Sequence, residues 1–299
     1  MSGASVFANH AHVFPAAINP AGTVDRLLAL LDACDIARAV CFAPFAYQCD
    51  DHREFGDPNA WLARELKPHA DRLVGFGTID LRRDDVTDQV HRAAELGFRG
   101  LKLHPNAQGF AICSPRALDC YAAAEQHNLF VCFHTGVHQS SLKDTRILLF
   151  DEIAWQFPNL RFSLEHVGGY HFFNEALAVI FNHVAPPWNP GRCNVFAGLA
   201  SVFSQTTNRF WYLSRERLLE LIAQAGARQV IFGLDFPYNG ETETKLALEV
   251  IRGLGLDDRD ERLILGGNLA HVGGGAPVNS RLLGRTREHA TSNLRCPRR

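Results

Sequence analysis

The chain has 299 residues, of which 46% are hydrophobic and 21% are charged. A chain of this length and composition can bury a large core, which indicates an ordinary globular protein. Its formal net charge is −2 with acids and bases interspersed, and this excludes the broad basic surface that binds a nucleic-acid backbone.

The chain carries no recognisable targeting or membrane signal. Its start, MSGASVFANHAHVF, has neither the basic nor the apolar region of a secretory signal. No uncharged apolar stretch approaches the ~18 residues that a membrane-spanning helix needs. The eight cysteines form no C-x-x-C pair, and several lie in apolar runs, which favours buried reduced thiols. We therefore expect a cytoplasmic protein with no membrane partner.

Eight short runs rich in β-forming residues predict strands along the chain. They cover residues 5–12, 37–44, 72–80, 98–104, 129–134, 160–166, 193–199 and 229–235. Segments with helical spacing lie between them and begin at typical start signals. These signals are Thr23, Asp57-Pro58, Ser114-Pro115 and Ser214.

The order of these elements predicts an α/β fold, a (β/α)8 TIM barrel. The predicted strand ends recur roughly every 24 to 36 residues, the length of a βα unit, and the strand runs are apolar throughout. A doubly wound open sheet is the alternative, because alternation alone does not prove closure. No linker divides residues 1–272, so we expect one barrel there. Residues 273–299 begin with three glycines and carry six arginines against one glutamate, which predicts a flexible tail.

Polar residues that end the predicted strands are the candidates for chemistry. His10 and His12 end the first strand at i, i+2, so alternation predicts that both point to the same face. His134 ends the fifth strand, His166 the sixth and Asp235 the eighth. Each alone could be a structural histidine or a helix cap, but barrel strand ends converge on one mouth. Neutral imidazoles with one carboxylate suit a divalent ion such as Zn²⁺.

These residues resemble the pattern of the amidohydrolase superfamily, in particular the branch with aminocarboxymuconate semialdehyde decarboxylase, resorcylate decarboxylases and several lactonases and hydratases. The resemblance covers about residues 6–272. It rests on the H-x-H of His10 and His12, the histidines that end strands five and six, and the aspartate of GLDFP. The segment GLKLHP and the GGN that contains Asn268 are further, less diagnostic features.

The resemblance implies that His10, His12, His134 and Asp235 bind one divalent metal, with Zn²⁺ the first choice and Mn²⁺ or Fe²⁺ as alternatives. It implies two catalytic residues, Asp235 as ligand and base at once, and His166 as acid/base or carbonyl polariser. General acid–base and metal chemistry support this division, because a carboxylate beside an activated water can receive its proton.

Four further residues are candidates for substrate binding. Lys102 and His104 end the fourth strand, Arg53 follows the second, and His138 follows the fifth. Binuclear members of the superfamily use a carboxylated lysine from the fourth strand, so Lys102 raises the alternative of a second metal. The simpler interpretation is that Lys102 or His104 pairs with Asp235 or binds an anionic group of the substrate. Arg53 is placed to clamp a carboxylate, and a solvated loop is its alternative.

The residues next to His166 in sequence can be explained by structural roles. Glu165 precedes it and by alternation is expected to face the helices in a structural role. Gly168 and Gly169 follow it and either allow a close approach to the substrate or form a plain strand-to-helix turn.

Three functions agree with this pattern. The first is a metal-dependent hydrolase that uses metal-activated water on a small amide, lactone or related substrate. The second is a metal-dependent carboxy-lyase acting on a small unsaturated or aromatic acid. Decarboxylases of this branch often have proline after the strand-five histidine, whereas Thr135 and Gly136 follow His134 here, which favours the hydrolase. The third is a non-catalytic binding protein that has kept the scaffold.

The expected partner is a small-molecule substrate, and a homodimer is a weaker expectation. Aromatic residues lie beside turn residues around Trp188 and Trp211, as in a dimer contact or a packed lid.

Overall fold

Eight parallel strands close into one barrel in the order in which they occur in the chain. The computed structural model describes residues 5–184 and 194–273. The strands are β1 (Val6–His12), β2 (Ile36–Phe42), β3 (Leu73–Thr78), β4 (Gly100–Leu103), β5 (Phe130–His134), β6 (Phe162–Glu165), β7 (Val195–Leu199) and β8 (Val230–Phe236). The predicted (β/α)8 barrel is confirmed, and because β1 pairs with β8 the open sheet is excluded.

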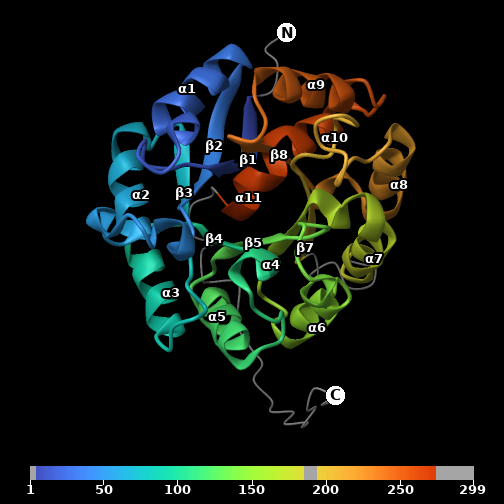
Figure 1. Cartoon of the computed structure of the whole chain (residues 1–299). Helices are drawn as coiled ribbons and strands as arrows, with labels where there is room; N and C mark the ends of the chain where they lie inside the picture. The colour runs from blue at the N-terminus through green and yellow to red at the C-terminus, as the bar shows by residue number, and fades with distance from the viewer. Residues whose placement is uncertain (1–4, 185–193, 274–299) are drawn as a thin grey trace, which may run out of the picture.

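Helices lie between successive strands and after β8, and most of them surround the barrel (Figure 1). They are α1 (Val24–Ala33), α2 (Pro58–Leu66), α3 (Val86–Glu95), α4 (Pro105–Gln108), α5 (Pro115–Gln126), α6 (Leu149–Gln156), α7 (Gly169–Asn182), α8 (Arg215–Ala225), α9 (Glu241–Arg252), α10 (Asp258–Arg262) and α11 (Asn268–Gly273). Four of them begin at the expected N-caps, and the side chains of Thr23, Asp57 and Ser214 accept hydrogen bonds from first-turn N–H groups. Ser114 is the N-cap of α5, ahead of Pro115.

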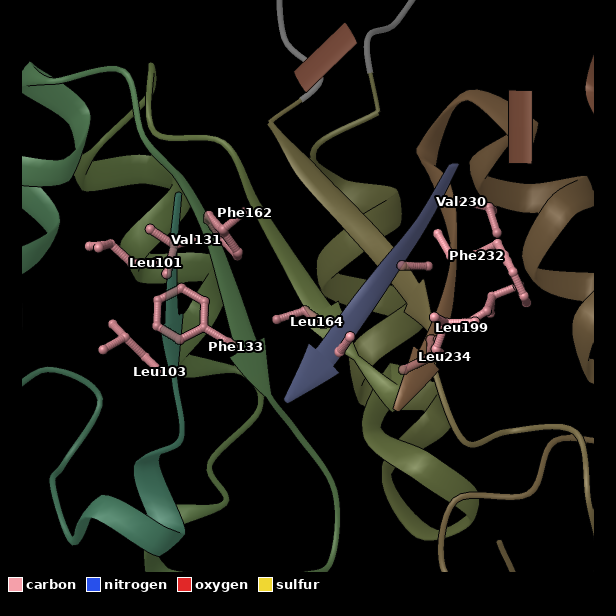
Figure 2. Close-up of a cluster of buried hydrophobic side chains, with 14 of the residues drawn as sticks. Leu101, Leu103, Val131, Phe133, Phe162, Leu164, Leu199, Val230, Phe232 and Leu234 are labelled. Carbon is pink, nitrogen blue, oxygen red and sulfur yellow. The ribbon is translucent and has the colours of Figure 1, made fainter. Parts of the chain in front are cut away.

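Two apolar layers follow from the alternation of side chains along the strands. The outer layer packs between the strands and the helices, and Figure 2 shows Leu101, Val131 and Phe133 gathered beside β4 and β5. The inner layer fills the barrel and joins Phe76 and Phe130 to Leu269 of α11. The interior is therefore a packed core, and room for a site remains at the carboxyl ends of the strands.

Three further expectations concern the C-terminal tail, the segment around Trp188 and membrane-spanning helices. Only Gly273 of the tail predicted for residues 273–299 lies within the described residues, and Trp188 also lies outside them. Across residues 5–184 and 194–273, none of the helices combines the length and apolar character needed to span a bilayer.

Candidate functional site

A cavity of about 320 Å³ opens at the carboxyl ends of the barrel strands. Seven residues that the sequence puts forward as site residues line it: His10, His12, His104, His134, His138, His166 and Asp235. They come from five strands or the turns that follow them, so barrel closure brings together residues that are far apart in sequence.

Three of these side chains meet closely enough to hold a metal ion. The Nε2 atoms of His10 and His12 lie 3.3 and 3.8 Å from Oδ1 of Asp235. One ligand atom from each of the three lies within 4.8 Å of the other two. Burial lowers the pKa of both histidines well below 6.5, so they are neutral and their contacts with Asp235 are not ion pairs. Two neutral imidazoles and a carboxylate around one point fit a divalent ion.

Glu165 determines which nitrogen of His10 carries the proton. Nδ1 of His10 lies 2.7 Å from Oε2 of Glu165, and since a carboxylate oxygen only accepts, Nδ1 donates. The lone pair of His10 is therefore on Nε2, the atom that faces Asp235. Nζ of Lys102 also lies 3.2 Å from this Nε2 and donates to it.

The expectation that Glu165 faces the helices is wrong. Its side chain is fully buried inside the barrel and contacts Ser163, which shares its face of β6. Alternation holds only while the backbone is extended, and His166 directly after the strand has φ = +63°. Because of this left-handed residue, the side chains of both Glu165 and His166 point inward.

A chain of hydrogen bonds also fixes the protons of His134 and His166. Nδ1 of His166 lies 2.7 Å from the carbonyl oxygen of Ala200, so it donates to that oxygen. Its Nε2 therefore carries the lone pair and accepts from Nδ1 of His134, 3.1 Å away. This leaves a lone pair on Nε2 of His134, a buried atom with no hydrogen-bond partner among the described residues. His134 thus presents a free ligand atom to the cavity, although it is outside the group of three, and its role as metal ligand stays a prediction.

His104 is protonated on the opposite nitrogen. The backbone N–H of Ala107 donates to Nδ1 of His104 over 3.2 Å, so the proton of the neutral ring is on Nε2. This Nε2 is also buried without a partner among the described residues. The rings of His104 and His134 stack with centroids 3.7 Å apart and planes 12° from parallel. A hydrogen-bond donor and an acceptor therefore stand side by side in the cavity wall.

The whole imidazole cluster is held in its neutral form. Burial lowers the pKa of His104 and His134 well below 6.5, and burial together with the Lys102 charge lowers the pKa of His166 to about 3. Burial also lowers the pKa of His138, which lies closer to the cavity mouth. Neutral imidazole is the form that ligates metals and accepts protons.

Three of the cavity residues have backbone conformations that L-residues rarely adopt. His10, His166 and Asp235 have φ values of +68°, +63° and +61°. Such conformations cost on the order of 1–2 kcal/mol each and persist only where surrounding contacts hold them. Their concentration at one end of the barrel is typical of a functional site.

Asp235 is held by two residues that the sequence did not indicate. Ser201 donates a short hydrogen bond from Oγ to Oδ2 of Asp235. Nδ2 of Asn239 lies 3.0 Å from Oγ of Ser201 and donates to it. Ser201 has φ = +55° and follows β7, so an isolated serine in a loop gave no signal of this role.

Aromatic side chains form the remaining walls of the cavity. Trp211 stacks on His166 with ring centroids 4.8 Å apart, and its Nε1 donates to the carbonyl oxygen of Val137 over 3.0 Å. Tyr238 and Phe45 contact His12, at 5.8 and 6.3 Å between centroids. Of the two interpretations for Trp211, its position in the cavity wall favours the packed lid.

Two candidate substrate-binding residues have no described contact with the cavity. Lys102 is fully buried beside His10, and within the described residues it does not line the cavity. Arg53 begins a short 3₁₀ helix, Arg53–Phe55, and its side chain lies outside the described residues. Substrate contacts by either residue stay predictions.

Solved structures with the same fold include decarboxylases and a hydrolase. 5-Carboxyvanillate decarboxylase from Sphingomonas paucimobilis is 16% identical, with a TM-score of 0.66 over 90% of this chain and 99% of that one. Dihydroxybenzoic acid decarboxylase from Polaromonas, solved with bound manganese and the inhibitor 2-nitroresorcinol, is 13% identical, with a TM-score of 0.65 over 90% and 96%. A probable 2-pyrone-4,6-dicarboxylic acid hydrolase from Acinetobacter baumannii is 16% identical, with a TM-score of 0.65 over 90% and 98%. These likenesses show the fold alone.

The sequence itself gives the family. No curated protein matches the chain. The family model described as amidohydrolase matches residues 9–270, which include every residue of the candidate site. The predicted family is confirmed, and the chain belongs to the amidohydrolase family.

Proposed function

We propose that the protein is a metal-dependent hydrolase that uses metal-activated water on a small amide, lactone or related substrate. The observation that carries the proposal is the convergence of His10, His12 and Asp235 in a buried cavity. These three, with Nε2 of His134, would hold one divalent ion, of which Zn²⁺ fits the nitrogen-rich donor set best and Mn²⁺ or Fe²⁺ are alternatives. Bound there, the ion would acidify water and polarise a substrate oxygen.

The residues of the chain have separate tasks in this reaction. Asp235 takes the proton of the attacking water on Oδ1 and returns it to the leaving group, while Ser201 holds its other oxygen. His104 donates from Nε2 to the substrate oxygen that gains negative charge. His166 is held by the Ala200 carbonyl, and we assign it the acid/base role, which requires His134 to release Nε2 of His166 during turnover. His138 at the mouth contacts the substrate outside the reacting bond.

A carboxy-lyase is the second candidate because of the aromatic walls. Trp211 and Tyr238 both line the cavity and would contact a planar ring bound there. In that reaction Asp235 or His166 would first take up a proton from solvent and then pass it to the ring carbon as CO₂ leaves.

Product analysis distinguishes the two reactions. The metal-loaded protein is incubated with lactones, amides and hydroxylated aromatic acids, and acid release and CO₂ are measured in parallel. The hydrolase produces a new carboxylic acid without gas, and the carboxy-lyase releases CO₂. The Asp235→Ala variant should do neither. A wild-type chain that retains metal but turns over none of these substrates would favour a binding protein.

A further inference from the structure

We propose that Glu165 is a positioning residue for the metal site: it holds His10 in the tautomer and orientation that turn Nε2 toward Asp235. The inference rests on the proposed metal site and adds to it a residue that touches neither metal nor substrate. Buried carboxylates that accept from the second nitrogen of a metal-binding histidine fix the ring and raise its basicity.

The contact between the two side chains is close and dry. Oε2 of Glu165 accepts from Nδ1 of His10 at 2.7 Å, and the two side chains are 0% and 1% exposed. Because both side chains are buried, bulk solvent does not compete for the proton. The other nitrogen of His10 lies 3.3 Å from Oδ1 of Asp235, so one imidazole connects the buried carboxylate to the metal site.

The surrounding strands are built to hold this carboxylate. Asn9 donates from Nδ2 to Oε1 of Glu165 over 3.0 Å, and Ser163 donates to the same oxygen. On β7, a Cβ added at Gly198 would overlap the carboxylate, so only glycine leaves the space that it occupies. Every carboxylate oxygen has a donor, which is what burial of a charge requires.

Glu165 also helps to hold the left-handed backbone of His10. A residue with φ = +68° in a strand interrupts the alternation, and the pairing of β1 shifts register between Ala8 and Ala11. As a result, Asn9 and His10 are neighbours in sequence and yet both contact Glu165. The carboxylate therefore anchors the irregular end of β1 through hydrogen bonds to Asn9 and His10.

Two variants test the charge and the position of the carboxylate separately. Glu165→Gln keeps the size but replaces the strong acceptor with an amide that can also donate to His10 and reverse its tautomer. Gly198→Ala keeps the glutamate but displaces it. Ser163→Ala is the matched control, because it removes one donor to the carboxylate and leaves the contact with His10 in place.

Zinc affinity of the full-length chain is measured by competition with a chromogenic chelator. We expect Glu165→Gln and Gly198→Ala to weaken zinc binding by roughly 10- to 100-fold, the range found for such outer partners, and Ser163→Ala by less than about 3-fold. The Nδ1 proton of His10 is followed by NMR in the same samples. It should be exchange-protected at low field in the wild type and in Ser163→Ala, and shifted upfield or lost in the other two.

The outcomes separate this inference from the proposed function. If Glu165→Gln and Gly198→Ala bind zinc as tightly as Ser163→Ala and keep the low-field proton, Glu165 is merely structural and the inference fails. If Glu165→Gln does not fold, the zinc affinity and the His10 proton of Gly198→Ala decide whether Glu165 is a positioning residue. If the wild type binds no zinc, the metal proposal fails, while the His10 proton in the metal-free chain still shows whether Glu165 fixes the tautomer.

Discussion

The hydrogen bonds of single residues give the cavity its chemical character. The Ala200 carbonyl fixes the proton of His166 and, through it, that of His134, which therefore presents an acceptor. The N–H of Ala107 fixes the proton of His104, which presents a donor. Glu165 fixes the proton of His10 in the same way. Hydrogen-bond partners thus assign roles to residues of the same type, as is common in metal sites and active sites.

His166 should act in turnover and not in metal binding. It is outside the group of His10, His12 and Asp235 and, unlike His134, has a hydrogen-bond partner on both ring nitrogens. Its pKa of about 3 keeps it neutral at pH 7. We expect His166→Asn to lower kcat by roughly 10²- to 10⁴-fold on the substrate found by product analysis, with metal content unchanged. His171→Asn, an exposed histidine on α7, is the matched control and should keep the wild-type rate. An equal loss of metal and rate in His166→Asn would instead make His166 a ligand.

At the scale of elements, the sequence predicts the strands and helices well but not the irregular strand ends. Apolar runs and N-caps such as Thr23 and Ser214 are local signals, and these elements form where they predict. The inward position of Glu165 depends on the left-handed φ of His166, which no residue pattern indicates. The part played by Ser201 depends in the same way on a contact between distant strand ends, which only the closed barrel creates.

The turn after β6 supplies an element-scale prediction. Gly169 has φ = +67°, and a Cβ there would lie 2.8 Å from Cδ1 of Trp211, the side chain that stacks on His166. The ψ of −166° at Gly169 puts this backbone in a region that is open essentially only to glycine. We therefore expect Gly169→Ala to lower the free energy of unfolding by more than the roughly 1–2 kcal/mol that a left-handed alanine costs, and to displace Trp211. Urea unfolding and tryptophan fluorescence measure both effects.

Gly97→Ala is the matched control for that prediction. Gly97 has φ = +84° with nothing within 4 Å of its added Cβ, so it carries the backbone cost alone. If the tryptophan fluorescence of Gly169→Ala equalled that of Gly97→Ala, the contact between Gly169 and Trp211 would not matter.

At the scale of the whole molecule, barrel closure buries many neutral histidines at one end. Most lie on or just after different strands, and burial lowers the pKa of each one below 6.5. They are His10, His12, His104, His134 and His166. Folding therefore keeps protons off side chains that would bind them in the unfolded chain.

This burial predicts that acid destabilises the fold. Below pH 6.5 the unfolded chain takes up protons that the folded chain excludes, so stability is full above this pH and falls as the pH drops toward the folded pKa, about 3 for His166. We expect each buried histidine to cost about 1 kcal/mol of unfolding free energy between pH 7 and 5.5. Urea unfolding with a chelator present measures this, and equal or greater stability at pH 5.5 would refute it.

Metal content per chain tests whether His10, His12 and Asp235 hold a divalent ion. Wild type, Asp235→Ala and the exposed-site control Asp84→Ala are purified, supplemented with Zn²⁺, Mn²⁺ or Fe²⁺, and analysed by elemental analysis, with circular dichroism to confirm folding. We expect about one divalent ion per chain in the wild type and the control, lost or sharply weakened in Asp235→Ala. A folded wild type that stays metal-free, or an Asp235→Ala variant that keeps its full metal content, would contradict this expectation.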